Sequence, residues 1–600
     1  MRKLGLLAGL LVLAGCPKHP EVVDAGGLPP GAPKAVAEAE PNDGPKQAQK
    51  LVGAVDVTAS LHAPAGKKAD EDWYAVDPAL GHALVKVDPA PPLDVALEVY
   101  DSDGVKRMTQ DAAVGGGSEV IHGLDTARAV LVRVVGKADG LGGYHLTIAA
   151  DPDAASEEAE PNNRAADATP LEPGKPVQGY LSDATDEDWL KLSLPAPDGG
   201  SDAGALDAGV ALDAGIPEAV APDAGALDAG ALDAGAVPLA PTLPPPPPPM
   251  LLHLTVSGVP GVRLEVTVVN AAEAPLFSAR GKELGDGIEV RNLALRPPER
   301  EFYVVVKSAW VGTGKEAKRF ASVDKAYTVT AELEQAQGEV ELEPNDDAAH
   351  ATQVTLTGGG ASLEGYLTPK TDDDNFLVRS DTPMLARVEL SGVEHLDLEL
   401  DVLSVADGGK DQVVLTANDG EIKEPEVLTN LAVGPGGTYL RIRGAARRGP
   451  DGKWSRDSEN AQDPYRLTFT AAPDDGTRER EPNNAPETAT PIQLGQTLRG
   501  NIQPRRDADF YRLDLSSLPV KAQLHAVVSG ILKVDVALYL YRQGSDGSVA
   551  LVQTSDTAKG DAAESIRYAA DPGVYFLKVK DARDREANFV DAYAIHVETQ

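Results

Sequence analysis

The chain has 600 residues, and its 93 Asp and Glu residues outnumber 55 Lys and Arg residues, which gives a formal net charge of −38. A chain of this length can form several domains, and its acidity opposes binding to nucleic acid or to an anionic membrane surface. Aromatic residues make up only 4%, whereas Gly and Pro number 59 and 47. This composition suits short strands joined by turns, so we expect an all-β fold and no nucleic-acid partner.

Residues 1–15 have the pattern of a signal peptide that ends at a cysteine. Arg2 and Lys3 supply a positive start, Leu4 to Ala14 an apolar run, and Gly15 a small residue before Cys16. Leu-Ala-Gly-Cys resembles the lipobox of bacterial lipoproteins, in which the cysteine is acylated and becomes the mature N-terminus. The resemblance implies lipidation of Cys16, the only cysteine of the chain. The alternative is an ordinary signal peptide with an incidental cysteine.

The segment after the lipobox suggests how the protein is held at the membrane. Residues 16–36 are rich in Pro, Gly and Ala, as expected of a flexible tether. No other stretch approaches the roughly 20 apolar residues of a membrane span. We therefore expect attachment to the membrane through the lipid at Cys16. This predicts a location in the bacterial cell envelope, at the outer membrane or the cell surface.

Two acidic motifs recur along the rest of the chain. The first, E-x-E-P-N-[DN], begins at four positions: Glu38, Glu158, Glu341 and Glu479. The second, D-x-D before an apolar or aromatic residue, follows about thirty residues later: Asp70, Asp186, Asp372 and Asp507 begin it. A motif pair at domain-sized intervals predicts tandem copies of one domain. We expect four domains, at residues 37–150, 151–335, 336–473 and 474–600.

The two motifs crowd carboxylates together. In an extended chain, residues two positions apart point to the same side, so each motif should present a pair of acidic side chains. Two such pairs repel one another unless a proton or a cation intervenes, and oxygen ligands of this kind suit calcium. The candidate ligands are Glu38, Glu40, Asn42, Asp43, Asp70, Asp72, Glu158, Glu160, Asn162, Asn163, Asp186, Asp188, Glu341, Glu343, Asn345, Asp346, Asp372, Asp374, Glu479, Glu481, Asn483, Asn484, Asp507 and Asp509. The alternative is that E-P-N is turn chemistry and D-x-D a solvated strand edge.

After each D-x-D the copies repeat one pattern of strands. In the third copy Leu396, Leu398, Leu400 and Val402 alternate with acidic residues, which predicts a strand with one apolar face. Hairpin turns are predicted at three places: Ser102-Asp103-Gly104, Asn418-Asp419-Gly420 and Ser545-Asp546-Gly547. The last strand of each copy begins with a tyrosine: Tyr144, Tyr327, Tyr465 and Tyr593. The pattern favours tandem antiparallel β-sandwiches.

The order of these motifs resembles the bacterial pre-peptidase C-terminal domain and the related collagen-binding domains of clostridial collagenases. The resemblance covers nearly all of residues 38–600, apart from an insert in the second copy. It implies jelly-roll-like β-sandwiches and, in the collagen-binding branch, a calcium site at the acidic positions given above. Copies two and four have Asn163 and Asn484 where the others have Asp, which keeps an oxygen but removes a charge. No motif matches the collagen-contacting aromatics, so collagen binding is not implied.

Residues 196–249 form the insert in the second copy. Repeated Asp-Ala-Gly units lead into the proline run Pro244 to Pro249, and large apolar residues are scarce. Such a composition has little to bury, so we expect a disordered loop that ends in a stiff polyproline stretch. The regular Asp spacing also raises a calcium repeat, but the nonapeptide of calcium-binding solenoids is absent and a solvated linker is favoured.

The sequence offers no catalytic motif. G-x-S-x-G, H-E-x-x-H and C-x-x-C are absent, and Gly312-Thr313-Gly314-Lys315 lacks the spacing of a phosphate loop. We therefore expect a non-enzymatic array of binding modules, stabilised by calcium, that engages an extracellular protein or polysaccharide. Two alternatives stay open. One is a structural spacer of the outer envelope, and the other is an accessory subunit of a secreted peptidase.

The lipobox makes the first testable prediction. Replacing Cys16 by Ser removes the acylation site, so the variant protein should leave the membrane fraction and appear in the soluble fraction. Fractionation with and without detergent measures this. Continued dependence on detergent in the variant would reveal a second membrane attachment.

Overall fold

The chain is all-β, as expected. The computed structural model describes residues 32–63, 70–113, 115–137, 140–195, 248–336, 340–369, 371–405, 411–448, 452–456 and 459–599. Within these ranges the regular structure is strand, apart from short 3-10 helices, and none of these helices has the length and apolarity to cross a membrane. Cys16, most of the tether and residues 196–247 of the insert lie outside the described residues, so the expectations for them stay predictions.

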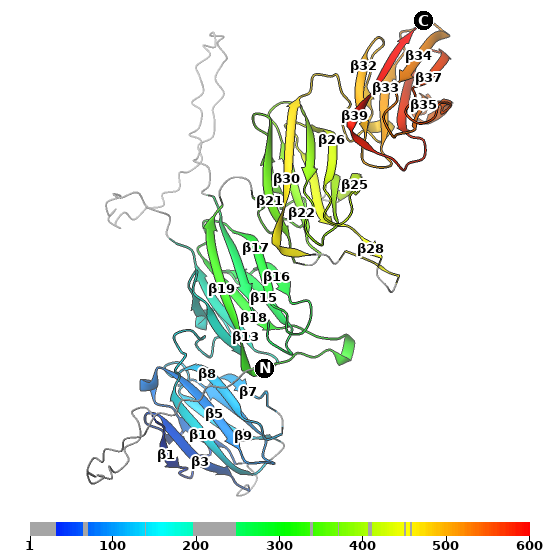
Figure 1. Cartoon of the computed structure of the whole chain (residues 1–600). Helices are drawn as coiled ribbons and strands as arrows, with labels where there is room; N and C mark the ends of the chain where they lie inside the picture. The colour runs from blue at the N-terminus through cyan, green and yellow to red at the C-terminus, as the bar shows by residue number, and fades with distance from the viewer. Residues whose placement is uncertain are drawn as a thin grey trace, which may run out of the picture. The chain divides into compact units, whose positions relative to one another are not determined.

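The chain divides into two compact units. One comprises residues 1–155 with 159–161, and the other residues 156–158 with 162–600. The large sheets come in pairs, one pair in the first unit and three in the second (Figure 1). Each pair encloses one hydrophobic core. We call a pair of sheets with its core a module, numbered one to four along the chain.

Module one consists of β1 to β10. Its strands are β1 (Lys34–Ala37), β2 (Gln49–Lys50), β3 (Val55–Leu61), β4 (Asp72–Ala75), β5 (His82–Pro89), β6 (Val95–Tyr100), β7 (Lys106–Gln110), β8 (Glu119–Asp125), β9 (Leu131–Gly136) and β10 (Gly142–Ala150), with the 3-10 helix η1 (Pro78–Leu80) after β4. The two sheets have the strand orders β1-β3-β10-β5-β8 and β2-β4-β9-β6-β7. Most neighbours are antiparallel, but β1 with β3 and β2 with β4 are parallel.

Module two consists of β11 to β19. Its elements are η3 (Ala165–Asp167), β11 (Thr169–Leu171), β12 (Val177–Leu181), β13 (Glu187–Ser193), β14 (Met250–Val256), β15 (Leu264–Asn270), β16 (Pro275–Arg280), β17 (Ile288–Leu295), β18 (Glu301–Ser308), η4 (Gly314–Glu316) and β19 (Ser322–Gln335). The sheets are β12-β19-β14-β17 and β11-β13-β18-β15-β16. Among the described residues, the strand order matches that of module one, apart from the lack of a counterpart to β1.

Module three consists of β20 to β30. Its strands are β20 (Thr352–Thr355), β21 (Gly360–Leu367), β22 (Asp373–Arg379), β23 (Met384–Leu390), β24 (Leu398–Val405), β25 (Asp411–Ala417), β26 (Glu426–Val433), β27 (Thr438–Gly444), β28 (Arg447–Arg448), β29 (Trp454–Ser455) and β30 (Asn460–Pro473). The two main sheets are β21-β30-β23-β26 and β20-β22-β27-β24-β25, and β28 with β29 forms a small separate hairpin.

Module four consists of β31 to β39. Its elements are η5 (Pro486–Thr488), β31 (Thr490–Pro491), β32 (Thr497–Ile502), β33 (Ala508–Asp514), β34 (Ala522–Val528), β35 (Val536–Gln543), β36 (Val549–Ser555), β37 (Glu564–Ala570), β38 (Val574–Asp581) and β39 (Asn588–Thr599). The sheets are β32-β39-β34-β37 and β31-β33-β38-β35-β36. The same arrangement therefore occurs three times in the second unit.

Strands form where apolar residues alternate, and their apolar faces build the cores. Strand β5 shows the pattern plainly, since every second residue from Ala83 to Pro89 is buried. In β24 the expectation of one solvated face is wrong, because Glu399 and Asp401 are buried as well. Arginines of the neighbouring strand cover them, with Arg441 2.7 Å from Asp401 and Arg443 2.6 Å from Glu399. A carboxylate is buried at lower cost when it is paired in this way.

Two of the three predicted hairpins are confirmed. Ser102-Asp103-Gly104 joins the paired strands β6 and β7, and Ser545-Asp546-Gly547 joins β35 and β36. The hairpin predicted at Asn418-Asp419-Gly420 is wrong. That segment leads from β25 to β26, which lie in different sheets of module three.

The strand arrangement brings the acidic motifs to one end of each module. In module three the second aspartate, Asp374, lies near the start of β22 in one sheet. The tyrosine of the last strand, Tyr465, lies in β30 of the other sheet. The E-x-E segment precedes both sheets and makes a parallel bridge from Val340 to Glu364 in β21. The fold thus places three distant segments next to one another.

Candidate metal centres

A buried tyrosine hydroxyl is the centre of the acidic cluster in module three. The hydroxyl of Tyr465 donates to Glu341 Oε1 at 2.8 Å and lies 2.7 Å from Asp374 Oδ2. The other carboxylate oxygen of Glu341 accepts the backbone N–H of Tyr366 at 2.8 Å. All three side chains of the cluster are almost fully buried. Sequence reasoning found the two acids but did not assign a role to the tyrosine.

Three other oxygens of this cluster have no hydrogen-bond donor. They are Oε1 of Glu343, Oδ1 of Asn345 and Oδ1 of Asp374, each on a side chain that is at least 98% buried. A buried polar atom without a partner is costly and calls for an explanation, such as a bound ion. Glu341, Glu343 and Asp374 each offer an oxygen within 4.8 Å of the others. This group can hold a metal ion.

Burial raises the pKa of four carboxyls in the acidic cluster of module three, those of Glu341, Glu343, Asp372 and Asp374. Burial is the main cause in each case, and for Glu343, Asp372 and Asp374 the charges of neighbouring acids add to it. Backbone hydrogen bonds to Glu341 and Asp372 oppose the rise of the pKa without cancelling it. Without a cation the carboxyls of the cluster therefore bind protons more readily than solvated carboxyls do. The remaining predicted acid, Asp346, is exposed, although its charge adds to the rise in the pKa of Asp372.

Module four has a similar arrangement with a second tyrosine, Tyr511, whose hydroxyl donates to Glu479 Oε2 at 3.2 Å and lies 2.6 Å from the hydroxyl of Tyr593. The hydroxyl of Tyr593 donates to Asp509 Oδ2 at 2.5 Å and lies 3.2 Å from Glu479 Oε2. Oxygens without a donor occur at the positions that correspond to those of module three: Glu481 Oε1, Asn483 Oδ1 and Asp509 Oδ1. The recurrence at matching positions argues against an accident of side-chain placement.

The predicted loss of charge in module four has a visible consequence. Asn484 replaces the aspartate of module three, and its Nδ2 donates to Asp507 Oδ1 at 2.9 Å. Burial raises the pKa of Asp507 to about 8, and the charge of Glu479 adds to this. Burial likewise raises the pKa of Glu479 to about 7. In module four the Asn484 amide therefore donates a hydrogen bond to Asp507. In module three Asp346 instead adds a negative charge near Asp372.

In module two the same contacts link residues of the second unit. Tyr327 donates to Asp188 Oδ2 at 2.5 Å and lies 3.3 Å from Glu158 Oε2, and the pKa of Glu158 rises to about 8 mainly through burial. Asn163 Nδ2 donates to Asp186 at 2.6 Å, as Asn484 does to Asp507. The remaining acid, Glu160, is buried and belongs to the first unit.

Module one has the most open cluster. Glu40 is exposed and Glu38 only half-buried, whereas Asn42 and Asp72 are fully buried. Glu40 and the predicted pair Asp70 and Asp72 still bring oxygens within 4.8 Å of one another. Burial raises the pKa of Asp72 to about 8, and the charge of Glu38 adds to this.

Two tyrosines share the acids of module one. Tyr144 donates to Asp72 Oδ2 at 2.6 Å, and Tyr74 donates to Glu38 Oε1 at 3.2 Å. The two hydroxyls lie 2.7 Å apart. In module three a single hydroxyl contacts both acids, so the first cluster is wider. Asp43 is half-buried beside it.

A glycine makes room for the tyrosine hydroxyl in three modules. A Cβ at Gly365 would lie 2.3 Å from the Tyr465 hydroxyl and 2.9 Å from the carboxyl carbon of Glu341. The same close approach to the tyrosine occurs at Gly179 and Gly500. The backbone N–H after each glycine donates to the first glutamate, and in module one the residue at this place is Ala59. The alanine agrees with the wider cluster there.

The recurring tyrosines are the site residues that sequence reasoning missed. The prediction that they begin the last strand of each copy is wrong, because these strands begin at Gly142, Ser322, Asn460 and Asn588 and hold the tyrosines in their interior. A tyrosine in a strand is normally explained by packing. The signal was the recurrence of tyrosine itself at a place where any large apolar residue would fill a core. In modules one and three, acids of the two predicted motifs lie within 4.8 Å of one another.

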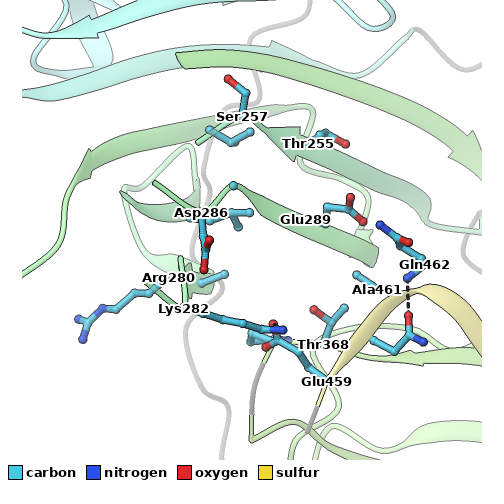
Figure 2. Close-up of a pocket in the computed structure, with 16 residues that line it drawn as sticks. Thr255, Ser257, Arg280, Lys282, Asp286, Glu289, Thr368, Glu459, Ala461 and Gln462 are labelled. Atoms are coloured by element: carbon cyan, nitrogen blue, oxygen red, sulfur yellow. Dashed lines mark hydrogen bonds and ion pairs between the residues drawn. The ribbon is translucent and has the colours of Figure 1, made fainter. Parts of the chain in front are cut away.

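One pocket of the second unit is separate from these clusters. It is an open cleft of about 610 Å³ lined by residues of β14, β16, β17 and β30 and by neighbouring loops. Figure 2 shows its side chains, which include the ion pair of Lys282 and Glu459 at 2.7 Å. None of the predicted ligands lines it.

Comparison with known proteins identifies no family. No family model matches the chain, and no curated protein matches it. Among solved structures, the pre-peptidase C-terminal domain of a collagenase from Bacillus anthracis matches at 21% identity over 19% of this chain and 100% of its own, with a TM-score of 0.16. The M60 catalytic domain with two CBM51 domains of Clostridium perfringens ZmpB matches at 10% identity over 59% of this chain and 32% of its own, with a TM-score of 0.11. At TM-scores this low, neither match bears on the function of this chain.

The glycine contacts make a prediction about packing. Gly365→Ala places a methyl group against the Tyr465 hydroxyl and should destabilise module three by about 1–3 kcal/mol, the usual cost of overpacking. Thermal unfolding of the full-length protein measures this. Gly434→Ala is the matched control, because a Cβ there meets nothing within 4 Å. Equal effects of the two variants would contradict the packing argument.

The raised pKa values make a prediction about pH. In module four Glu479 and Asp507 have pKa values of about 7 and 8, against 4.5 and 3.8 in an unperturbed chain. Between these values the folded state binds more protons than the unfolded state, so its stability falls as the pH rises. In chelator, the free energy of unfolding of module four should therefore decrease from about pH 5.5 to 8.

Calorimetry of the full-length protein across this pH range checks the expectation. The double variant Glu479→Gln with Asp507→Asn is the control, because neither replacement titrates. The fall in stability should be smaller in that variant. A wild-type stability that rises with pH would show that the two carboxyls are charged in the metal-free fold.

Proposed function

We propose that the protein is a non-catalytic array of four binding modules, anchored in the bacterial cell envelope by the lipid at Cys16. Each module would be a jelly-roll-like β-sandwich of the pre-peptidase C-terminal type, with boundaries near those expected from the sequence. Calcium would stabilise the modules, and an extracellular protein or polysaccharide would be the partner. The proposal combines the motif order of the sequence with the geometry of the acidic clusters.

The observation that carries the calcium proposal is the recurrence of buried oxygens without donors. In modules three and four they sit on the second glutamate, the asparagine and the second aspartate of each motif pair. Calcium takes six to eight oxygen ligands from carboxylates, amide carbonyls and water. The candidate ligand atoms of both clusters are all oxygens, which favours a hard cation over zinc or copper. A divalent ion would also offset the repulsion that raises the pKa values of these acids.

Exposed aromatic side chains favour a binding role over that of a spacer. Trp310 and Trp454 are 56% and 69% exposed. Both lie between the penultimate and the last strand of their modules' main sheets, β18 and β19 in one case and β27 and β30 in the other. Basic residues such as Arg319 and Arg448 lie in the same connections of an otherwise acidic chain. Exposed tryptophans beside cations are common in protein and carbohydrate recognition surfaces.

The calcium proposal predicts a ligand-dependent melting curve. At free calcium a hundredfold above the dissociation constant, one site should stabilise its module by about 2.7 kcal/mol. Calorimetry of the full-length Cys16→Ser protein in calcium and in chelator measures this. Asp374→Ala should abolish the calcium shift of module three, because it removes one of the proposed ligands.

Asp381→Ala is the matched control. Asp381 is an exposed acid of module three that lies outside the cluster, so its replacement should leave the calcium shift intact. If wild type and Asp374→Ala melt alike in both buffers, and calorimetry detects no binding at millimolar calcium, the acidic motifs are not a metal site.

A further inference from the structure

Three edge strands carry a bulge at the same place. In β8, β17 and β26 two residues stand opposite one residue of the neighbouring strand. The second bulge residue has a left-handed backbone in each case: Gly123 (φ 58°), Asn292 (φ 53°) and Asn430 (φ 55°). Glycine and asparagine are the residues that adopt this conformation most readily. Such a bulge redirects an edge strand and exposes its backbone groups to a new partner.

The partner in each case is the next E-x-E-P-N segment of the chain. The backbone N–H of its second glutamate donates to the carbonyl of the bulge residue: Glu160 to Gly123 at 3.0 Å, Glu343 to Asn292 at 3.0 Å and Glu481 to Asn430 at 2.9 Å. The carbonyl of the same glutamate accepts an N–H from two residues beyond the bulge residue: Asp125 at 2.7 Å, Ala294 at 2.8 Å and Ala432 at 2.9 Å. The E-x-E segment thus adds to the edge as a short parallel strand.

We call the backbone pairing of a bulge with the next E-x-E segment a joint. At two joints the side chains of Asn292 and Asn430 also contact the acidic cluster of the following module. Asn430 Nδ2 donates to Glu479 Oε1 at 2.8 Å and to Asn501 Oδ1 at 3.2 Å. Asn292 Nδ2 lies 3.5 Å from Glu341 Oε2. Both asparagines are more than 90% buried. A side chain of one module therefore helps to hold the first glutamate of the next module's cluster.

The bulge of the first unit uses different side-chain chemistry. Gly123 has no side chain to offer, and its N–H donates to Asp151 Oδ2 at 2.9 Å. Arg128 instead donates to the carbonyls of Ala159 and Pro161 at 2.9 and 3.3 Å. The backbone pairing is thus the same within the first unit and at the two joints of the second unit, whereas the link into the acidic cluster belongs to Asn292 and Asn430.

Module four lacks this feature. Its corresponding edge strand, β37, pairs with β34 without a register shift from Glu564 to Ala570. Bulges therefore occur on the three edges that receive an E-x-E segment and not on β37. The fold of a module therefore does not require the bulge at this edge.

We propose that, within the second unit, the left-handed bulge residues Asn292 and Asn430 are receptors that fix the following module and couple this joint to the acidic cluster of that module. Their recognition partner is the E-x-E-P-N segment of the same chain. The positioning role of the asparagines concerns the joint and does not require a metal. Only the further coupling, in which occupancy of the cluster and docking of the joint favour one another, rests on the proposed calcium site.

The joint between modules three and four offers the sharper test, because Asn430 makes the shorter contact. In the full-length Cys16→Ser protein, spin labels at Thr382→Cys and Ser545→Cys report the distance between the two modules. Both positions are exposed. Wild type should give one narrow distance distribution in calcium by pulsed electron resonance. Asn430→Gly keeps the left-handed backbone and removes the amide, so the undocked population should rise about tenfold, the usual effect of losing a hydrogen bond to a charged group.

Lys423→Gly is the matched control. Lys423 also has a left-handed backbone (φ 69°) in module three, but it lies outside the joint. Its variant should keep the wild-type distribution. An Asn430→Gly distribution as narrow as wild type would overturn the proposal, as would a broad distribution in wild type. If direct titration shows no calcium bound while Asn430→Gly still broadens the distribution, the joint stands and the calcium proposal falls.

Discussion

The burial of several carboxylates around the tyrosine hydroxyl of the last strand is the constraint on which the rest of each module depends. In module three, Glu341 and Asp374 come from segments more than thirty residues apart, and Tyr465 lies about ninety residues further along the chain. One hydroxyl can donate only one proton, so it satisfies one acid and leaves the other to a proton or a cation. Without either, like charges would oppose the meeting of both sheets with the E-x-E segment.

This constraint explains features that would otherwise look independent. A glycine is needed on the neighbouring strand because the hydroxyl occupies the space of a Cβ, as at Gly365. The asparagine of the motif is buried because its backbone N–H donates to the carboxylate of the second glutamate, as that of Asn345 does to Glu343 Oε2 at 3.1 Å. The backbone carbonyl of the same asparagine accepts the backbone N–H of the residue after D-x-D, as that of Asn345 does from Asn375 at 3.1 Å. The motif is therefore a set of contacts that closes one end of a module.

Sequence reasoning predicted the parts of the fold and the site that local pattern carries. The all-β class follows from alternation in strands such as β5, and the acidic pairs were recognisable from their period of two and their recurrence. It failed where the cause lies elsewhere in the chain. Glu399 and Asp401 looked solvated because their arginine partners come about forty residues later. Asn430 lies 49 residues before the glutamate it contacts in the next module, whereas Asn418, with its turn signature, contacts only Glu399 of its own module among the described residues.

The four clusters are consequently unequal, and their differences follow from what surrounds each one. In module one, Glu40 is exposed and Ala59 takes the place of the glycine, so the acids are better solvated and repel one another less. In module three the acids are almost fully buried, and Asp346 adds a further negative charge beside Asp372. A buried cluster gains more from neutralisation than a solvated one, because water screens the charges less. The dependence of stability on a proton or a cation should therefore be weaker in module one than in module three.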